Sequence, residues 1–388
     1  MIRFPNKDFL LRLFAAGLKF LTLLIILKVD KFTVPIFYFY STFAAFLYKF
    51  TVLSELNNYR RLTNEINFFK INIFYFINSL SRMLFFLIII YIFASFFEYK
   101  SYFISIAFFI LTTFLINYIS AIFIVNSNQL SASIVYFIGS ASLFFAVIIA
   151  SLIEGNFLNN ICTIYFFLSC LIFVVKFGIP KIMFSYDKKF INRFTIYFIR
   201  KNFNIRLFYQ LRRGFNSVSG YLITALVAYY ISSYEHLNID LKNLLIISLY
   251  ISNIILLYLL TSKVFPHVLK ITKGEFKLMG LKKIIQIISL LIIMYFITIF
   301  SLPQYIEIVT IFYSISLFVF FSYLISFQDF YIQARTIKLK YFACFILFIL
   351  TNFYLLDFFY GQFFFLPILL ILPRFSIFLL NKLFFKEF

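Results

Sequence analysis

The stretch that decides the fold is KFGIPKIMFSYDKKFINRFTIYFIRKNFNIRLFYQLRR, Lys176–Arg213. It holds ten Lys or Arg residues and one acid, Asp187, yet it separates two halves that are almost uninterrupted hydrophobic segments. Between the basic residues, aromatic residues recur at helical spacing from Phe190 to Phe198, a pattern typical of a helix lying on an anionic membrane surface. We therefore expect a basic joint that faces the cytoplasm and links two similar bundles of transmembrane helices. A solvated basic segment is the alternative.

The composition of the whole chain indicates a polytopic membrane protein. Of its 388 residues, 63% are hydrophobic and only 13% are charged, whereas soluble domains are about a quarter charged and about half apolar. The mean hydropathy is +0.99. The net charge of +21 does not indicate nucleic-acid binding, because the basic residues lie between apolar segments, where positive charge orients membrane spans.

The chain divides into twelve apolar segments, because a span needs about 20 apolar residues to cross roughly 30 Å of hydrocarbon. The segments lie at approximately 9–27, 33–53, 72–97, 102–125, 130–153, 158–178, 214–234, 241–262, 281–302, 305–326, 339–356 and 362–381. This pattern predicts an all-α fold with about 12 transmembrane helices in two six-helix bundles around a central cavity. We expect an N-terminal bundle over 1–180, a basic cytoplasmic linker with an interfacial helix over 181–210, and a C-terminal bundle over 211–388.

The distribution of basic residues predicts the orientation of these spans. Of the 35 Lys and Arg residues, 29 fall at the termini or in alternate connections, including Arg374 near the C-terminus, and four fall in the other connections. Because cytoplasmic connections carry the excess of Lys and Arg, both termini are predicted to be cytoplasmic. Each half has an even number of spans, so the two halves would form parallel repeats.

The sequence offers little for enzyme chemistry. The nine glycines form no phosphate-binding loop, the three cysteines have no metal-ligand spacing, and His236 and His267 are expected on opposite sides of the membrane. No carboxylate pair lies at catalytic spacing inside a span. We therefore expect no enzymatic activity, no cofactor and no metal site, which favours transport.

Polar residues inside the spans are the candidate site. Lys19 and Arg82 each lie near the middle of a span, where a basic residue costs about 2.5–3.5 kcal/mol on insertion scales and usually faces a bundle interior or a water-filled cavity. We predict a cationic cavity for an anionic headgroup, lined by Arg82, Lys19, Asn78, Asn117 and Asn253. The alternative is that Lys19 extends toward the membrane surface and that the amides form hydrogen bonds between helices.

The acidic residues assign no coupling ion. A proton- or sodium-coupled carrier usually has a carboxylate buried in the membrane, and the acids of this chain fall near the ends of the predicted spans. Asp30 and Glu98 are candidates only if they fold inward.

The layout of the chain is similar over essentially its whole length to that of a known family. The opening span, Leu10–Val29, is followed directly by the segment Phe32–Arg61. The eighth span runs into Lys-Val-Phe-Pro-His-Val-Leu-Lys at 263–270 and then Gly274-Glu275-Phe276. In these features the chain resembles the Wzx-type O-antigen and capsular polysaccharide flippases of the multidrug/oligosaccharidyl-lipid/polysaccharide exporter superfamily.

The resemblance implies a transport function and its partners. It implies translocation of an undecaprenyl-pyrophosphate-linked oligosaccharide across the bacterial inner membrane by alternating access. The expected partners are this lipid-linked oligosaccharide, membrane lipids and other membrane proteins of polysaccharide assembly, with no nucleic acid. Lys19 and Arg82 are the positions that fit the basic residues with which family members hold the pyrophosphate.

Three other functions compete with this hypothesis. A cation-coupled drug or small-molecule antiporter has the same architecture, but it needs a buried acid where the first span has Lys19. An integral membrane oligosaccharide polymerase typically has a long outer loop with catalytic arginines, and no outer connection here exceeds about ten residues. A structural scaffold would not need Lys19 and Arg82 in its spans.

Overall fold

The computed structural model describes residues 7–62, 79–92, 100–125, 129–177, 238–259, 281–333 and 366–384, with single helical positions within 222–232 and 343–354. Every regular element in this part of the chain is a helix, so the predicted all-α class is confirmed. Six of the described helices are long and apolar enough to cross a membrane. Their apolar stretches are Leu10–Val29, Phe103–Ser120, Leu130–Ala150, Ile239–Leu256, Lys283–Ser301 and Pro303–Ile325.

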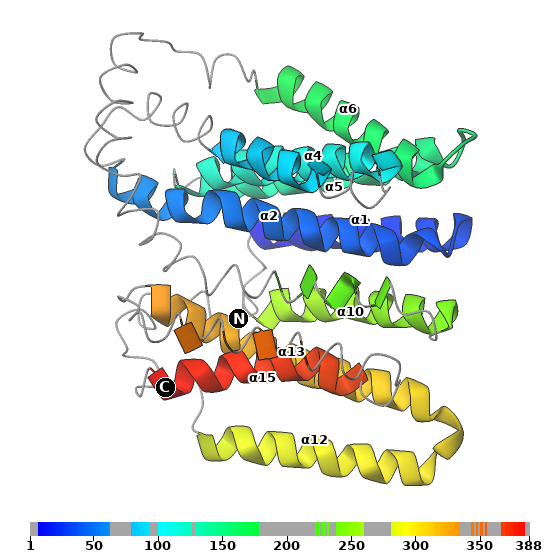
Figure 1. Ribbon diagram of the computed structural model, residues 1–388, viewed down its shortest axis with the longest axis vertical. Helices are drawn as coiled ribbons and strands as arrows, with labels where there is room; N and C mark the ends of the chain where they lie inside the picture. The colour runs from blue at the N-terminus through cyan, green and yellow to red at the C-terminus, as the bar shows by residue number, and fades with distance from the viewer. Residues whose placement is uncertain are drawn as a thin grey trace. The chain divides into compact units, whose positions relative to one another are not determined.

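Contacts divide the chain into two compact units, Met1–Ala225 and Leu226–Phe388. The predicted linker at 181–210 lies outside the described residues. In the first unit, near-parallel helices lie side by side (Figure 1). They are α1 (Lys7–Val29), α2 (Thr33–Leu62), a helix over 79–92, α4 (Lys100–Val125), α5 (Gln129–Ala150) and α6 (Phe157–Phe177).

Short side-chain caps separate these helices. The Asp30 backbone N–H donates to the Ile26 carbonyl at 2.8 Å, which closes α1, and the Asp30 carboxylate accepts from the Phe32 N–H at 3.0 Å and from the Thr33 hydroxyl, at the start of α2. This is the role of an N-cap aspartate. Before α6, Gly155 takes a φ of +117° that other residues avoid. The hairpin turns therefore follow from a few local residues.

Aromatic contacts show that α2 and α4 run in the same direction. Phe37 meets Phe109 with ring centroids 5.6 Å apart, and further along both helices Tyr48 meets Phe114 at 6.4 Å. The Tyr48 hydroxyl then donates to the carbonyl of Asn117 at 3.0 Å. Residue numbers rise together along both helices, so α2 and α4 are parallel.

α6 is also parallel to α4. Near the start of both helices the Ser105 hydroxyl donates to the side-chain carbonyl of Asn159, and one turn further Phe108 stacks on Phe166 with centroids 4.9 Å apart. Residue numbers again rise together.

α5 packs antiparallel to α4 and very close to it. The Ser120 hydroxyl donates to the Ala132 carbonyl at 3.3 Å, near the end of α4 and the start of α5. Further along α5, a Cβ on Gly139 would lie 2.7 Å from the side chain of Ile116. Gly139 is therefore required for this close approach, as small residues commonly are between membrane helices.

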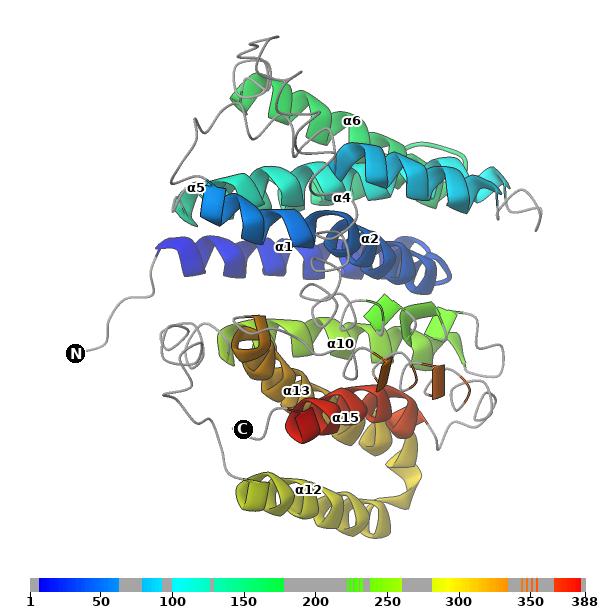
Figure 2. The same cartoon turned by 60° about the vertical axis from the view of Figure 1, so that its left-hand side comes forward.

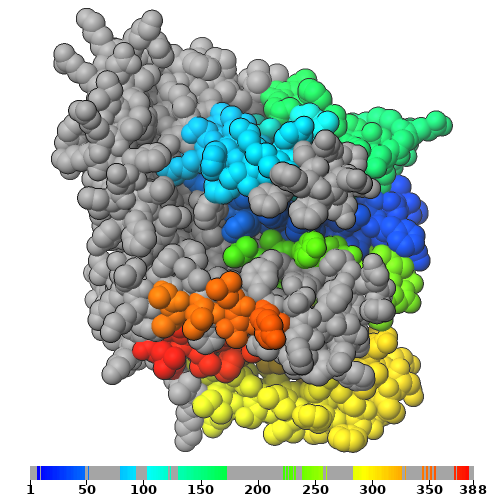
Figure 3. All heavy atoms as spheres, viewed as in Figure 1, coloured from blue at the N-terminus to red at the C-terminus, as the bar shows by residue number. Residues whose placement is uncertain are grey.

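The second unit contains α10 (Ile239–Leu259), α12 (Leu281–Ser301), the short 3-10 helix η3 (Pro303–Tyr305), α13 (Ile306–Gln333) and α15 (Leu366–Phe384). α13 is its centre, because α10, α12 and α15 all pack against it (Figure 2). α12 and α13 form a hairpin through η3. Large apolar side chains lie exposed around α12, whose yellow atoms lie at the surface in Figure 3.

α13 and α15 are parallel, and polar side chains mark both ends of their contact. The Arg374 guanidinium lies 5.0 Å from the ring centre of Phe318. Further along both helices, the Asn381 amide donates to the side-chain oxygen of Gln328 at 2.9 Å. Both amides are buried.

Candidate functional site

Lys19 lies on the face of α1 that packs against α5. Asp8 and Arg12, at the start of α1, both contact Ser133 of α5. Residues three, four or seven apart share a helix face, so the face with Asp8 and Arg12 continues through Ala15 to Lys19. It then continues through Thr22, Leu23 and Ile26. The predicted site residue thus points into the packed side of its helix.

The side chain of Lys19 is exposed although its neighbours on this face are not. Ala15 is 5% exposed, and Thr22, Leu23 and Ile26 are completely buried, whereas Lys19 is exposed. The Lys19 side chain therefore keeps accessible surface in the middle of α1, on its packed face. Most of the opposite face carries exposed apolar side chains, as expected for contact with lipid: Leu10, Leu13, Phe14, Leu21 and Leu24.

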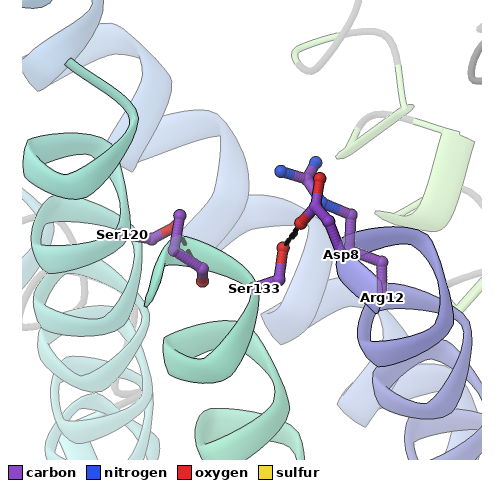
Figure 4. A network of polar contacts seen from close by, with 5 residues as sticks. Asp8, Arg12, Ser120 and Ser133 are labelled. Atoms are coloured by element: carbon purple, nitrogen blue, oxygen red, sulfur yellow. Dashed lines mark hydrogen bonds and ion pairs between the residues drawn. The ribbon is translucent and has the colours of Figure 1, made fainter. Parts of the chain in front are cut away.

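A polar cluster joins α1 to α5 two turns before Lys19. Arg12 Nε donates to Ser133 Oγ at 3.0 Å and to Asp8 Oδ1 at 3.4 Å, and the Ser133 hydroxyl donates to the same carboxylate oxygen. Figure 4 shows Asp8 and Arg12 reaching from α1 toward Ser133 on α5. The Arg12 guanidinium also lies 6.0 Å from the ring centre of Tyr136, within cation–π range. We call Asp8, Arg12 and Ser133 the Asp8–Arg12–Ser133 cluster.

The register of α1 and α5 places a second serine level with Lys19. These two make the most extensive contact between described helices, and because their first turns touch, they run parallel. Lys19 comes seven residues after Arg12, and Ser140 comes seven residues after Ser133, so both lie about 10 Å further along the axis at 1.5 Å per residue. The Ser140 hydroxyl donates to the Tyr136 carbonyl at 2.9 Å and is buried.

Arg82 lies at the margin of the packed face of its helix. It is half-buried, and both Ser79 and Met83 beside it are completely buried. The opposite face is exposed and apolar, with Leu84, Phe85, Ile88 and Tyr91. Arg82 therefore does not lie on the face suited to lipid. Asn78, which was predicted beside it, lies outside the described residues.

The two remaining predicted residues lie on other helices. The Asn117 amide donates to the Thr113 carbonyl at 2.8 Å, while its backbone carbonyl accepts from Tyr48. It lies on α4, which packs against α2 and α5, as α1 does. Asn253 is exposed on α10 in the second unit. The hydrogen bond of the Asn117 amide lies within α4, and it is its backbone carbonyl that joins α4 to α2.

Of the two acids considered for ion coupling, Asp30 and Glu98, only Asp30 lies among the described residues. Asp30 caps α2 and therefore has a structural role. Glu98 lies outside the described residues. Within the described ranges, no group of three His, Cys, Asp or Glu residues could hold a metal ion.

Arg374 is a residue that the sequence reasoning misplaced. It was counted with the basic C-terminal segment, but it lies in the middle of α15, is only 8% exposed and sits against Phe318. Counting charges by proximity to a terminus caused the error. A basic residue inside an apolar segment, the signal used for Lys19 and Arg82, would have identified it.

A scan against protein-family models, a search of curated proteins and a search of solved structures found no match to this chain. The fold and the site by themselves define an all-helical protein with several helices able to span a membrane. Its first helix carries an exposed basic side chain on a packed face.

Proposed function

We propose that this protein is a flippase for a polyprenyl-pyrophosphate-linked oligosaccharide in the bacterial inner membrane, with both termini in the cytoplasm. One observation carries the proposal: Lys19 is exposed in the middle of α1 on a face where Ala15, Thr22, Leu23 and Ile26 are buried. A lysine that only extended toward the membrane surface would not need water on a packed face. An anion passing through that water would meet a positive charge at mid-membrane.

The directions of the helices support a chain with about 12 spans in two bundles. In a bilayer, two parallel helices of one chain must be separated by an odd number of crossings. The parallel pair α2 and α4 therefore calls for a crossing between them, where the helix over 79–92 lies. The parallel pair α13 and α15 calls for another, where single helical positions lie within 343–354.

The chemistry of the two basic residues suits a diphosphate. Lysine offers a compact charge with three rotatable donors, and arginine offers a planar fork that holds two oxygens at once. Lys19 would hold the headgroup at mid-membrane, and Arg82 would orient it, while the polyprenyl tail stays in lipid. The transfer needs no bond to break, so we propose transport and not enzyme chemistry.

The acids favour this proposal over a cation-coupled antiporter. An antiporter for cations needs a carboxylate in the cavity. In the described part of the first unit, Asp30 is a helix cap, Asp8 is paired with Arg12, and Glu154 is exposed in the turn after α5. None of these three acids lies at mid-span, where α1 carries Lys19.

The test is translocation in proteoliposomes. The full-length protein is reconstituted with a fluorescent polyprenyl-pyrophosphate-linked sugar, and dithionite added outside quenches the probe in the outer leaflet. We expect Lys19→Met and Arg82→Gln to slow translocation at least about tenfold each, because a tenfold effect corresponds to about 1.4 kcal/mol and a hydrogen bond to a charged group contributes about 1.5–3 kcal/mol.

Lys31→Gln is the matched control, because Lys31 is an exposed lysine just beyond α1. It should translocate at the normal rate. Full activity in both Lys19→Met and Arg82→Gln would contradict the proposal. So would translocation no faster than in protein-free liposomes.

A further inference from the structure

Two cations share the α5-facing side of α1, and only one of them lies at mid-helix. Arg12 and Lys19 are seven residues apart, about 10 Å along the axis. Ser133 and Ser140 follow the same spacing on α5. The two positive side chains thus lie on one face of α1, and the two serines lie at the same spacing on α5.

The pairing of Arg12 with Asp8 is suited to exchange. Their side chains keep 23% and 19% of their surface exposed, and their atoms are 3.4 Å apart, longer than the 2.7–2.9 Å typical of charge-assisted bonds. Ion pairs between residues i and i+4 are weak. Both hydrogen bonds from Arg12 to described residues leave through Nε, so neither Asp8 nor Ser133 binds the two terminal NH2 groups of the guanidinium.

We propose that the Asp8–Arg12–Ser133 cluster is a diphosphate-binding position on the same face of α1 as Lys19, in which Asp8 stands in for the ligand when none is bound. This inference rests on the proposed function and adds a position before Lys19. The diphosphate of a polyprenyl lipid binds the terminal NH2 groups of Arg12 and displaces Asp8 from Nε.

The fluorescence of a single introduced tryptophan can report this exchange. The chain contains no tryptophan, so Tyr136→Trp places the only one beside the Arg12 guanidinium. The full-length Tyr136→Trp protein in nanodiscs of zwitterionic lipid is titrated with inorganic pyrophosphate and with farnesyl diphosphate, a short polyprenyl diphosphate. We expect both to change the fluorescence. Farnesyl diphosphate should bind at least about tenfold tighter, because its apolar tail also enters lipid.

Variants of the cluster should change affinity in opposite directions. Asp8→Asn removes the internal competitor and should tighten diphosphate binding about threefold to tenfold, whereas Arg12→Gln should weaken it at least about tenfold, since charge-assisted bonds are about twice as strong as neutral ones. Arg12→Lys keeps the charge but loses the fork and should be intermediate. Lys31→Gln should bind as the parent does.

Several outcomes would overturn the inference. If the cluster only holds α1 to α5, Asp8→Asn and Arg12→Gln should both lower the thermal stability of the protein. Their affinity for the diphosphate should then be unchanged or weakened equally. Equal affinity for inorganic pyrophosphate and farnesyl diphosphate would show that the cluster does not recognise a lipid-linked diphosphate. If Asp8→Asn and Arg12→Gln bind normally while Lys19→Met still stops translocation, the cluster proposal fails alone. If Asp8→Asn and Arg12→Gln shift diphosphate affinity in opposite directions but the parent protein does not translocate the lipid, only the proposed function fails.

Discussion

α5 and α12 are both apolar enough to cross a membrane, with hydropathies of 2.2 and 2.4 over Leu130–Ala150 and Lys283–Ser301, yet 56% of the first stretch is buried and only 6% of the second. The difference lies in side-chain size. α5 places small residues where it meets α4 and α1, including Ala132, Ser133, Gly139 and Ser140. α12 carries Ile, Leu and Phe on nearly every side.

The comparison shows what hydropathy can and cannot indicate in a membrane. Lipid tails are as apolar as leucine, so no hydrophobic force drives one such helix against another, and association depends on close packing and hydrogen bonds. Hydropathy therefore identifies both helices as spans. The pattern of small residues identifies which one is packed.

The largest effect should come from filling the small-residue contact of α5. Gly139→Leu forces a side chain into Ile116, whose atoms already lie within 3 Å of a Cβ at this position. We expect a loss of about 2–3 kcal/mol or more, as overpacking typically costs 1–3 kcal/mol. Thermal or denaturant unfolding of the purified protein in detergent measures it.

Gly17→Leu on α1 is the matched control for this substitution. A Cβ at Gly17 meets nothing within 4 Å, and leucine is a better helix former than glycine. The variant should be as stable as the parent protein or slightly more stable. Equal losses at Gly17 and Gly139 would contradict the account of close packing.

A smaller effect should follow from truncating one apolar side chain on each helix. Leu143 on α5 is 5% exposed and Ile293 on α12 is 54% exposed. Leu143→Ala should cost about 1–3 kcal/mol through the cavity it leaves, less than in a soluble core because the transfer to lipid contributes little. Ile293→Ala should cost less than about 0.5 kcal/mol. Unfolding of the two variants under the same conditions would sharpen the comparison, and equal costs would break it.

The smallest effect concerns the hydroxyl contacts of α12 with α13. Tyr295 meets Thr310 at 3.2 Å, and Thr298 meets Tyr313 at 3.1 Å. Hydrogen bonds between membrane helices average about 0.6 kcal/mol, so Tyr295→Phe should lower stability by about that amount. Ser316→Ala, which removes only a bond within α13, should cost less. A loss above about 2 kcal/mol for Tyr295→Phe would show that α12 is held mainly by this contact.

Properties that depend on neighbouring residues could be predicted from the sequence. The apolar segments 9–27 and 130–153 became α1 and α5 within a few residues, because segment length and hydropathy set a span. The pairing of Asp8 with Arg12 follows helical spacing. Their shared partner Ser133 is 121 residues away, and no local pattern indicates it.

Properties that depend on packing could not be predicted. Lys19 was selected because it lies at mid-span, but its exposure on a buried face depends on where α5 lies. Asp30 was considered for coupling because it is an acid near a span, and its role as a cap depends on the turn to Thr33. Arg374 was assigned to the C-terminal segment because charge was counted without the helix that contains it.

Water at Lys19 is the central claim, and cysteine labelling tests it most directly. Single cysteines replace Lys19 and, as a control on the opposite face, Leu21, in a chain whose Cys162, Cys170 and Cys344 are changed to alanine. A charged methanethiosulfonate reacts with the thiolate, which needs water to form. The account predicts rapid reaction at position 19 and none at position 21. Reaction at position 21 with none at position 19 would contradict it.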